Sequence, residues 1–216
     1  MESAVAVRNH DADEVVDVFL SIMRGVGHRV EPRVGPDPTK PYGDSHEVIC
    51  GRSIGGWVSL RTHYVVQPED LAVELTRRLD TMASAVSIYE DVLWMHHLVD
   101  RGHVVDRYVN LPGYFGPGEY DDTWGGDAAL VASAVGVDVR ELAPYFRQVS
   151  VRRARTRFLL PIKAHRTDTY NLLTGWVVTE LWQRMGIEWP DPTDSAIRVP
   201  LGQDGTTALT EWLRTR

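Results

Sequence analysis

The clearest alternation of apolar and polar residues lies between residues 85 and 112. Runs rich in β-branched and aromatic residues are separated there by two short polar pairs, Glu90-Asp91 and Arg101-Gly102. Polar pairs between such runs are typical of tight turns that join antiparallel strands. The pattern therefore predicts three consecutive β-strands connected by two turns.

A two-residue turn at Arg101-Gly102 fixes the expected register of the second hairpin. Because side chains alternate between the two faces of a strand, His97 is expected opposite Asp106 and on the same face as Asp106. A slip of one residue would exchange the faces, and the pattern does not decide which face is buried. One face would carry Met95, His97, Val99, Val104, Asp106 and Tyr108. The other face would carry Trp94, His96, Leu98, His103, Val105 and Arg107.

Apolar positions spaced three or four residues apart predict two helices before these strands. The first helix follows Asp11, which with Glu14 forms a variant of the capping box, and ends near Gly25 or Gly27. The second helix begins at Pro68, because proline is favoured at the first helical position. The two apolar stripes consist of Val15, Phe19 and Ile22, and of Leu71, Leu75 and Leu79.

Three further segments, residues 4–8, 46–51 and 56–62, have the composition of strands. The expected order is then β-α-β-β-α-β, extended by a hairpin. This order contains the split βαβ pattern of ferredoxin-like sandwiches, in which the helices lie on one face of an antiparallel sheet. The predicted fold class is therefore α+β, with this core in residues 1–110.

The sequence changes character after residue 110, where we expect an aromatic loop and a mainly helical segment, residues 111–216, packed on the first half as one compact unit. Glycine and proline punctuate the loop. The elements expected after it are short helices at 127–135 and 138–148, an arginine-rich strand at 149–162, a longer helix at 168–185 and a short helix at 207–214.

Composition narrows the classes of function. Of 216 residues, 43% are hydrophobic and 25% are charged, which is ordinary for a globular protein. A net charge of −7 argues against nucleic acid as a partner. No run reaches the ~20 apolar residues of a membrane span, and the N-terminus lacks the pattern of a signal peptide. We therefore expect a cytoplasmic protein. Its arginine-rich, lysine-poor composition suggests a GC-rich bacterial genome.

A group of histidines in the predicted strands is the first candidate site. His97 facing Asp106 would be an imidazole oriented by a carboxylate, as in a general base, with Arg107 close by. His96 and His103 could instead join His46 or His63 at a metal, but no spacing matches a known metal motif. The alternative is that these histidines are ordinary structural residues of the sheet. We expect neither a metal nor a cofactor.

The aromatic loop and an arginine-rich run are two further candidates. Exposed loop aromatics often anchor binding partners, although these could instead fold back and cap the sheet. Alternation along a strand would align the arginines for carboxylate or phosphate binding, although they could instead pair with the protein's own acidic residues. The candidate binding residues are Tyr108, Tyr114, Phe115, Tyr120, Trp124, Arg153, Arg155 and Arg157. The single cysteine, Cys50, is expected in the core rather than as a nucleophile.

No catalytic signature occurs in the sequence. We therefore expect a cytosolic binding or interaction protein, of a regulatory or immunity-like kind, whose partner is a protein or a small anionic ligand. Association into a homodimer is compatible with this reading. The alternative is a cofactor-independent enzyme for a small acidic metabolite, in which His97 acts as the base and Arg107 or Arg155 holds the anion.

Overall fold

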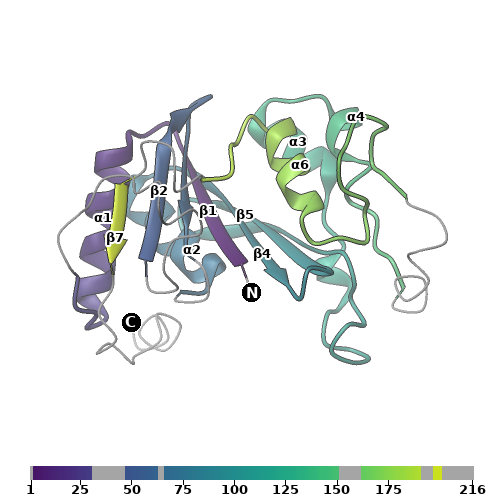
Figure 1. Cartoon of the computed structure of the whole chain (residues 1–216), viewed down its shortest axis with the longest axis horizontal. Helices are drawn as coiled ribbons and strands as arrows, with labels where there is room; N and C mark the ends of the chain where they lie inside the picture. Colours follow the sequence, from purple (N-terminus) through teal and green to yellow (C-terminus); the bar gives the residue numbers. More distant parts are fainter. Residues whose placement is uncertain (1, 31–46, 63–65, 151–161, 191–196, 201–216) are drawn as a thin grey trace.

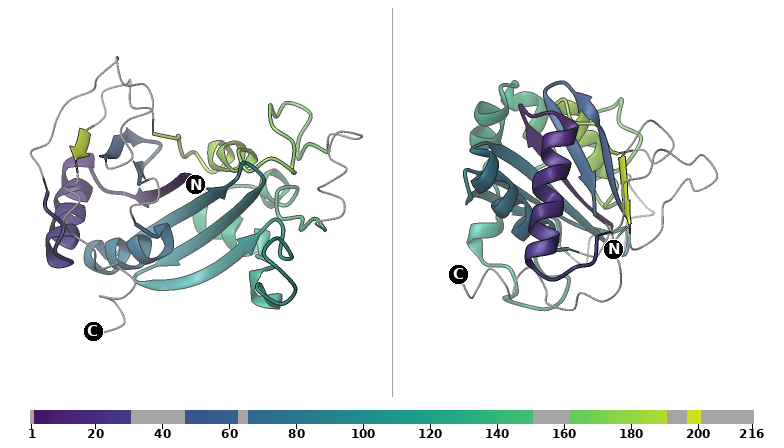
Figure 2. Two further views of the ribbon diagram at one scale, coloured as in Figure 1. Left: turned by 60° about the horizontal axis from the view of Figure 1, so that its bottom comes forward. Right: turned by 90° about the vertical axis from the view of Figure 1, so that its left-hand side faces the viewer.

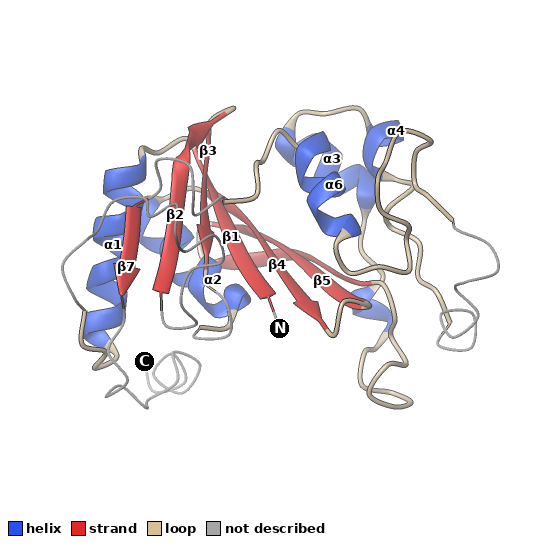
Figure 3. Ribbon diagram, in the orientation of Figure 1, coloured by secondary structure: helices blue, strands red, loops and turns tan. Residues whose placement is uncertain are grey.

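The computed structural model describes residues 2–30, 47–62, 66–150, 162–190 and 197–200. Its centre is a seven-stranded antiparallel sheet in the order β6-β5-β4-β1-β3-β2-β7 (Figures 1 and 3). The chain is therefore an α+β protein, as the sequence predicts. The strands are β1 (Glu2–Arg8), β2 (Glu47–Ile54), β3 (Trp57–Arg61), β4 (Met82–Tyr89), β5 (Leu93–Asp100), β6 (His103–Val109) and β7 (Ile197–Pro200).

Helices α1 (Ala12–Gly25) and α2 (Pro68–Leu79) pack on one face of the sheet. The Asp11 side chain caps α1 by accepting a hydrogen bond from the backbone N–H of Glu14, and Pro68 stands at the start of α2, as predicted. Phe19 and Leu75 are completely buried in this layer. Figure 2 shows the two helices side by side against the strands.

Helices α3 (Ala128–Val135), α4 (Val139–Leu142) and α6 (Val177–Arg184) form a second group on the opposite face (Figure 1). Their apolar side chains share a core with Ala4, Ala6, Trp94 and Leu98 from the sheet. A short 3-10 helix, η1 (Asp122–Trp124), precedes them. None of the helices in the described ranges is long and apolar enough to cross a membrane.

The helix predicted at residues 168–185 is shorter in the structure, where only Val177–Arg184 is α-helical. Gly175 packs against the β4–β5 turn, and its N–H donates to the carbonyl of Asp91 at 2.8 Å. A Cβ atom on Gly175 would lie 2.6 Å from the side chain of Ile88, so only glycine fits at this close approach. Tertiary packing thus overrides the helical spacing of the apolar residues.

Three other expectations differ from the structure or lie outside the described residues. The helix expected at 138–148 ends at Leu142, two residues before Pro144, which cannot continue the backbone ladder. Strand β7 pairs with β2 although no strand was predicted there. The strand expected at 149–162 and the helix expected at 207–214 fall mainly on residues that the structure does not describe.

Candidate functional site

A pocket of about 440 Å³ opens between the N-terminus of α2, the surface of strands β4 and β5, and the aromatic loop that follows β6. Its floor is the sheet face that α2 covers in part. Several candidates from the sequence meet in it. The lining residues are Gln67, Pro68, Glu69 and Asp70 from α2 and its cap, Ser87, Met95 and His97 from the strands, and Tyr120 and Trp124 from the loop.

His97 is paired with Glu69 rather than with the predicted Asp106. The imidazole Nε2 lies 3.1 Å from Oε2 of Glu69, and the other carboxylate oxygen accepts a hydrogen bond of 2.9 Å from Arg107. The His97 side chain is only 4% exposed, whereas that of Glu69 is 30% exposed. Within the described part of the chain, neither ring nitrogen of His97 has a hydrogen-bond partner, so the approach of Nε2 to Glu69 is a close contact between the two groups and not a hydrogen bond. A base–carboxylate–arginine group therefore borders the pocket.

A β-bulge explains why the predicted partner was wrong. Asp100 faces His103 and Val99 faces Val104, as the two-residue turn requires, but the register shifts after Val99. One extra residue in β6 places Arg107 opposite His97 and Asp106 opposite Leu98. Beyond the bulge, Asp106 and Tyr108 therefore share the face of Leu98, and Arg107 that of His97.

Asp106 has a structural partner on its own face of the sheet. Its Oδ1 accepts a hydrogen bond of 2.7 Å from the backbone N–H of Asp127, just before α3. Burial raises the pKa of this carboxyl. Asp106 thus connects β6 to α3 and does not orient His97 through a cross-strand pair.

The electrostatics of the pocket centre on Glu69. Contact with His97, and then with Arg107, lowers the pKa of Glu69 from 4.5 to about 2, although partial burial acts in the opposite direction. Glu69 therefore stays ionised at neutral pH. Its charge is shared between two basic groups, so the trio is close to electrically balanced.

The aromatic loop folds back over the sheet, which is the alternative to an exposed binding loop. Two of its rings also line the pocket. Trp124 contacts His97 edge to face with ring centroids 5.2 Å apart, and the Arg107 guanidinium lies 5.9 Å from the Trp124 centroid. Tyr120 donates a hydrogen bond of 3.5 Å to the sulfur of Met95. These contacts fix both rings next to the His97–Glu69 pair.

The other loop aromatics lie elsewhere. Tyr114 donates a short hydrogen bond to Glu90 and packs with Phe115 around Tyr89. Phe115 is 47% exposed and stays a candidate contact for a partner. Tyr108 is completely buried on the face of α3 and α4, packed against Trp94 and Phe146, so in this structure it is part of the core.

The remaining histidines do not form a metal site in the described ranges. His96 is completely buried, its Nε2 lies 3.0 Å from Oγ of Ser84, and burial lowers its pKa to about 3. His103 is exposed at the start of β6. Among described residues no group of three or more His, Cys, Asp or Glu side chains could hold a metal ion. His46, His63, Arg153, Arg155 and Arg157 lie outside the described residues.

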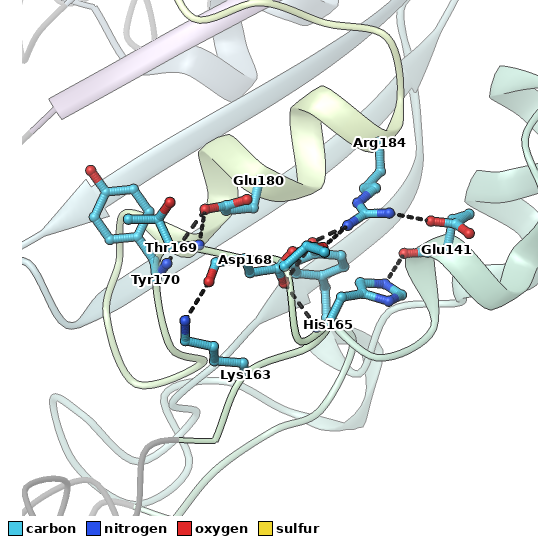
Figure 4. A network of polar contacts seen from close by, with 10 residues as sticks. Glu141, Lys163, His165, Asp168, Thr169, Tyr170, Glu180 and Arg184 are labelled. Carbon is cyan, nitrogen blue, oxygen red and sulfur yellow. Dashed lines mark hydrogen bonds and ion pairs between the residues drawn. The ribbon is translucent and has the colours of Figure 1, made fainter.

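A second polar cluster, around Asp168, was not anticipated from the sequence. The buried carboxylate of Asp168 accepts hydrogen bonds from the Tyr145 hydroxyl at 2.9 Å and from the His165 backbone N–H at 2.9 Å. Arg184 bridges Asp168 at 3.3 Å and Glu141 at 2.6 Å (Figure 4). The carboxylate and carbonyl groups of this cluster accept hydrogen bonds from other residues of the cluster. We therefore interpret it as a structural clasp that holds residues 162–172 against α4 and α6.

Two other pockets lie beside the β2–β3 turn. The larger, of about 580 Å³, is lined by Ile54, Gln183, Ile187 and Trp189 among others, and Glu188 is the only ionisable residue among its described lining residues. The smaller has a volume of about 50 Å³. The smaller pocket brings Arg52, Glu188 and Trp189 together, but its volume is far below that of a small-molecule site. The larger pocket has no basic group among its described lining residues, so the pocket beside His97 is the better candidate site.

Comparisons with protein-family models, with curated proteins and with solved structures find no match for this chain. The inference of function therefore depends on the geometry described above.

Proposed function

We propose that the chain is a cytosolic binding protein whose ligand occupies the pocket between α2 and the aromatic loop. The observation that supports this proposal is the convergence of His97, Glu69, Tyr120 and Trp124 on one pocket from three separate elements. Ligand sites commonly combine apolar and aromatic walls with a few well-placed polar groups. A volume of about 440 Å³ is within the range of small-molecule sites.

The burial of His97 favours binding over catalysis. Neither ring nitrogen of His97 is accessible to solvent, and its Nε2 faces Glu69. A general base must reach the proton that it removes, through direct contact or through one water molecule. Ser87 lines the same pocket, but the described atoms include no hydrogen bond from it to His97, so it is not an activated nucleophile in this arrangement.

Native mass spectrometry of the protein as purified tests the proposal. We expect a bound small molecule on the wild-type chain and on Phe115→Leu, an aromatic loop variant outside the pocket. The same mass should be missing from Trp124→Leu. Retention of the ligand by Trp124→Leu would place the binding site elsewhere.

The second candidate function is that of a cofactor-independent enzyme, in which Glu69 replaces Asp106 as the partner of His97. The supporting observation is the distance of 3.1 Å between Nε2 and the Glu69 carboxylate beside the pocket. Incubating the protein with the ligand found by mass spectrometry separates the two functions. A binding protein returns the ligand unchanged, whereas an enzyme converts it and the variant His97→Gln does not.

We also propose that residues 2–89 form a ferredoxin-like core. The order β4-β1-β3-β2, with antiparallel neighbours and both α1 and α2 on one face, supports this reading. Three further points are predictions: the chain forms a homodimer, it contacts a protein partner through Phe115, and it has no affinity for nucleic acid. Size-exclusion chromatography with light scattering checks the first of these.

A further inference from the structure

We propose that the ligand of this pocket is a small organic cation with a methylated ammonium group. The inference rests on the proposed function, because it names the chemistry of a ligand for the same pocket. It replaces the small anionic ligand expected from the sequence. Three features of the described residues support it: the arrangement of the aromatic rings, the charges around them and the apolar floor.

Tyr120 and Trp124 form two walls that meet at a steep angle. Their ring centroids are 4.8 Å apart, and the ring planes are inclined by 71°. This is an edge-to-face contact, in which the edge of one ring lies against part of the face of the other. The ring face that the contact leaves uncovered can attract a quaternary ammonium group. Trp124 already attracts one cation in this structure, the guanidinium of Arg107. The aromatic part of the pocket therefore suits a positively charged group.

Carboxylates dominate the charge around these rings. Glu69 and Asp70 line the pocket from the first turn of α2. The loop that carries the two rings adds the exposed Glu119, Asp121 and Asp122. Among the described residues, the charges of Glu69 and Arg107, 2.9 Å apart, offset each other, and His97 faces the same carboxylate. The excess negative charge therefore comes from the other carboxylates, mainly those of the loop. The resulting negative potential attracts cations and opposes anions.

The floor of the pocket suits the methyl groups of such a cation. Met95 contributes a polarizable thioether from β5, held in place by the hydroxyl of Tyr120. A methylated ammonium spreads its charge over an apolar surface and loses little hydration when it enters such a site. A free small molecule is the expected source of this group, because the site is a pocket between two elements of one chain.

Isothermal titration calorimetry on the full chain with three probes of matched shape tests the inference. The probes are choline, its neutral isostere in which carbon replaces the quaternary nitrogen, and the tert-butylacetate anion. We expect choline to bind about tenfold more tightly than the neutral isostere, and the anion to bind most weakly. Equal affinity for choline and the isostere, or tighter binding of the anion, would overturn the inference.

Variants of the two rings, with a control variant outside the pocket, test whether choline binds next to these rings. Trp124→Leu should weaken choline binding about tenfold and change binding of the neutral isostere little, while Phe115→Leu should change neither. Tyr120→Leu replaces Trp124→Leu if the latter lowers the thermal midpoint. Choline binding that is insensitive to both ring substitutions would contradict the proposed cage.

Two further outcomes keep this inference separate from the proposed function. A co-purified neutral or anionic ligand that is lost in Trp124→Leu would overturn the cation while preserving the pocket as a binding site. Co-sedimentation with phosphatidylcholine vesicles would show that a lipid headgroup, and not a free molecule, carries the ammonium group, and would overturn the assignment to a free cation.

Discussion

At the scale of single residues, His96 makes the folded state sensitive to acid. Burial lowers the pKa of His96 to about 3 in the folded chain, from 6.5 in an exposed histidine. Between these pH values the unfolded state binds a proton that the folded state excludes, so stability falls as the pH decreases. The expected contribution is about 1.4 kcal/mol per pH unit below 6.5.

Urea unfolding at a series of pH values between 6.5 and 4 measures this contribution. His96→Gln, which keeps a nitrogen near Ser84, should lose part of the acid dependence. The exposed His103→Gln is the control and should retain it. Parallel stability curves for all three proteins would show that His96 does not resist protonation.

Protonation of Glu69 should also lower the stability of the fold as the pH decreases, but at lower pH than protonation of His96. Its pKa is lowered from 4.5 to about 2 by His97 and Arg107, so the charged form stabilises the fold above pH 4.5. This contribution is lost as the pH falls from 4.5 toward 2. The difference in unfolding free energy between wild type and Glu69→Gln should therefore shrink over that interval. A constant difference would mean that the ionised carboxylate is not what His97 and Arg107 stabilise.

The sequence indicates three of the nine residues that line the pocket, His97, Tyr120 and Trp124, but not the pairing of His97 with Glu69. His97, Arg107, Tyr120 and Trp124 were candidates because of their residue types and positions. Nothing in the sequence marks Glu69 as the partner of His97, because acidic residues are common in the first turn of a helix. The bulge at Val105 could not be foreseen, because no glycine or polar residue marks it, and it changes which carboxylate His97 meets.

At the scale of elements, the two helical stripes form the main core, and two substitutions there should be costly. Phe19 and Leu75 are both completely buried under the sheet. Phe19→Ala and Leu75→Ala should each lower the unfolding free energy by roughly 2 to 5 kcal/mol. His103→Ala, at an exposed strand end, should change it by less than about 0.5 kcal/mol. Thermal melts decide, and small equal losses at all three positions would contradict the assigned core.

The clasp around Asp168 should contribute as much to the free energy of unfolding as a buried apolar contact. Replacing Asp168 by alanine leaves the Tyr145 hydroxyl and the His165 backbone N–H without this acceptor, and Arg184 keeps Glu141 but loses one of its two carboxylate partners. The expected loss of unfolding free energy is at least ~1.5 to 3 kcal/mol, the contribution of one hydrogen bond to a charged group. Glu119→Gln, at an exposed loop position, is the control. Equal melting temperatures for the two variants would show that the cluster does not hold residues 162–172.

Local signals predicted elements well where one residue determines the backbone. Asp11 caps α1, Pro68 begins α2, and Arg101 and Gly102 both adopt positive φ angles in the turn between β5 and β6. The predicted secondary structure was wrong where tertiary packing determines the backbone conformation. The segment before α6 has helical spacing, yet Gly175 must approach Ile88 closely, a constraint that appears only once the sheet is built.

At the scale of the whole molecule, the aromatic loop links the first half of the chain to the second and completes the pocket. Leu93, Val109 and Leu111 form a small core beneath it, with Tyr120 and Trp124 packed on top. The fold class could be predicted from strand and helix order alone. The pocket could not, because α2, β5 and the loop are brought together only by the sheet order.

Crystals soaked separately with a set of small-molecule fragments test the central claim most directly. The account predicts that bound fragments gather between Trp124 and the first turn of α2, in contact with Met95 or Glu69. Fragments that instead gather in the larger pocket beside Ile54 and Trp189, with none next to Trp124, would contradict it.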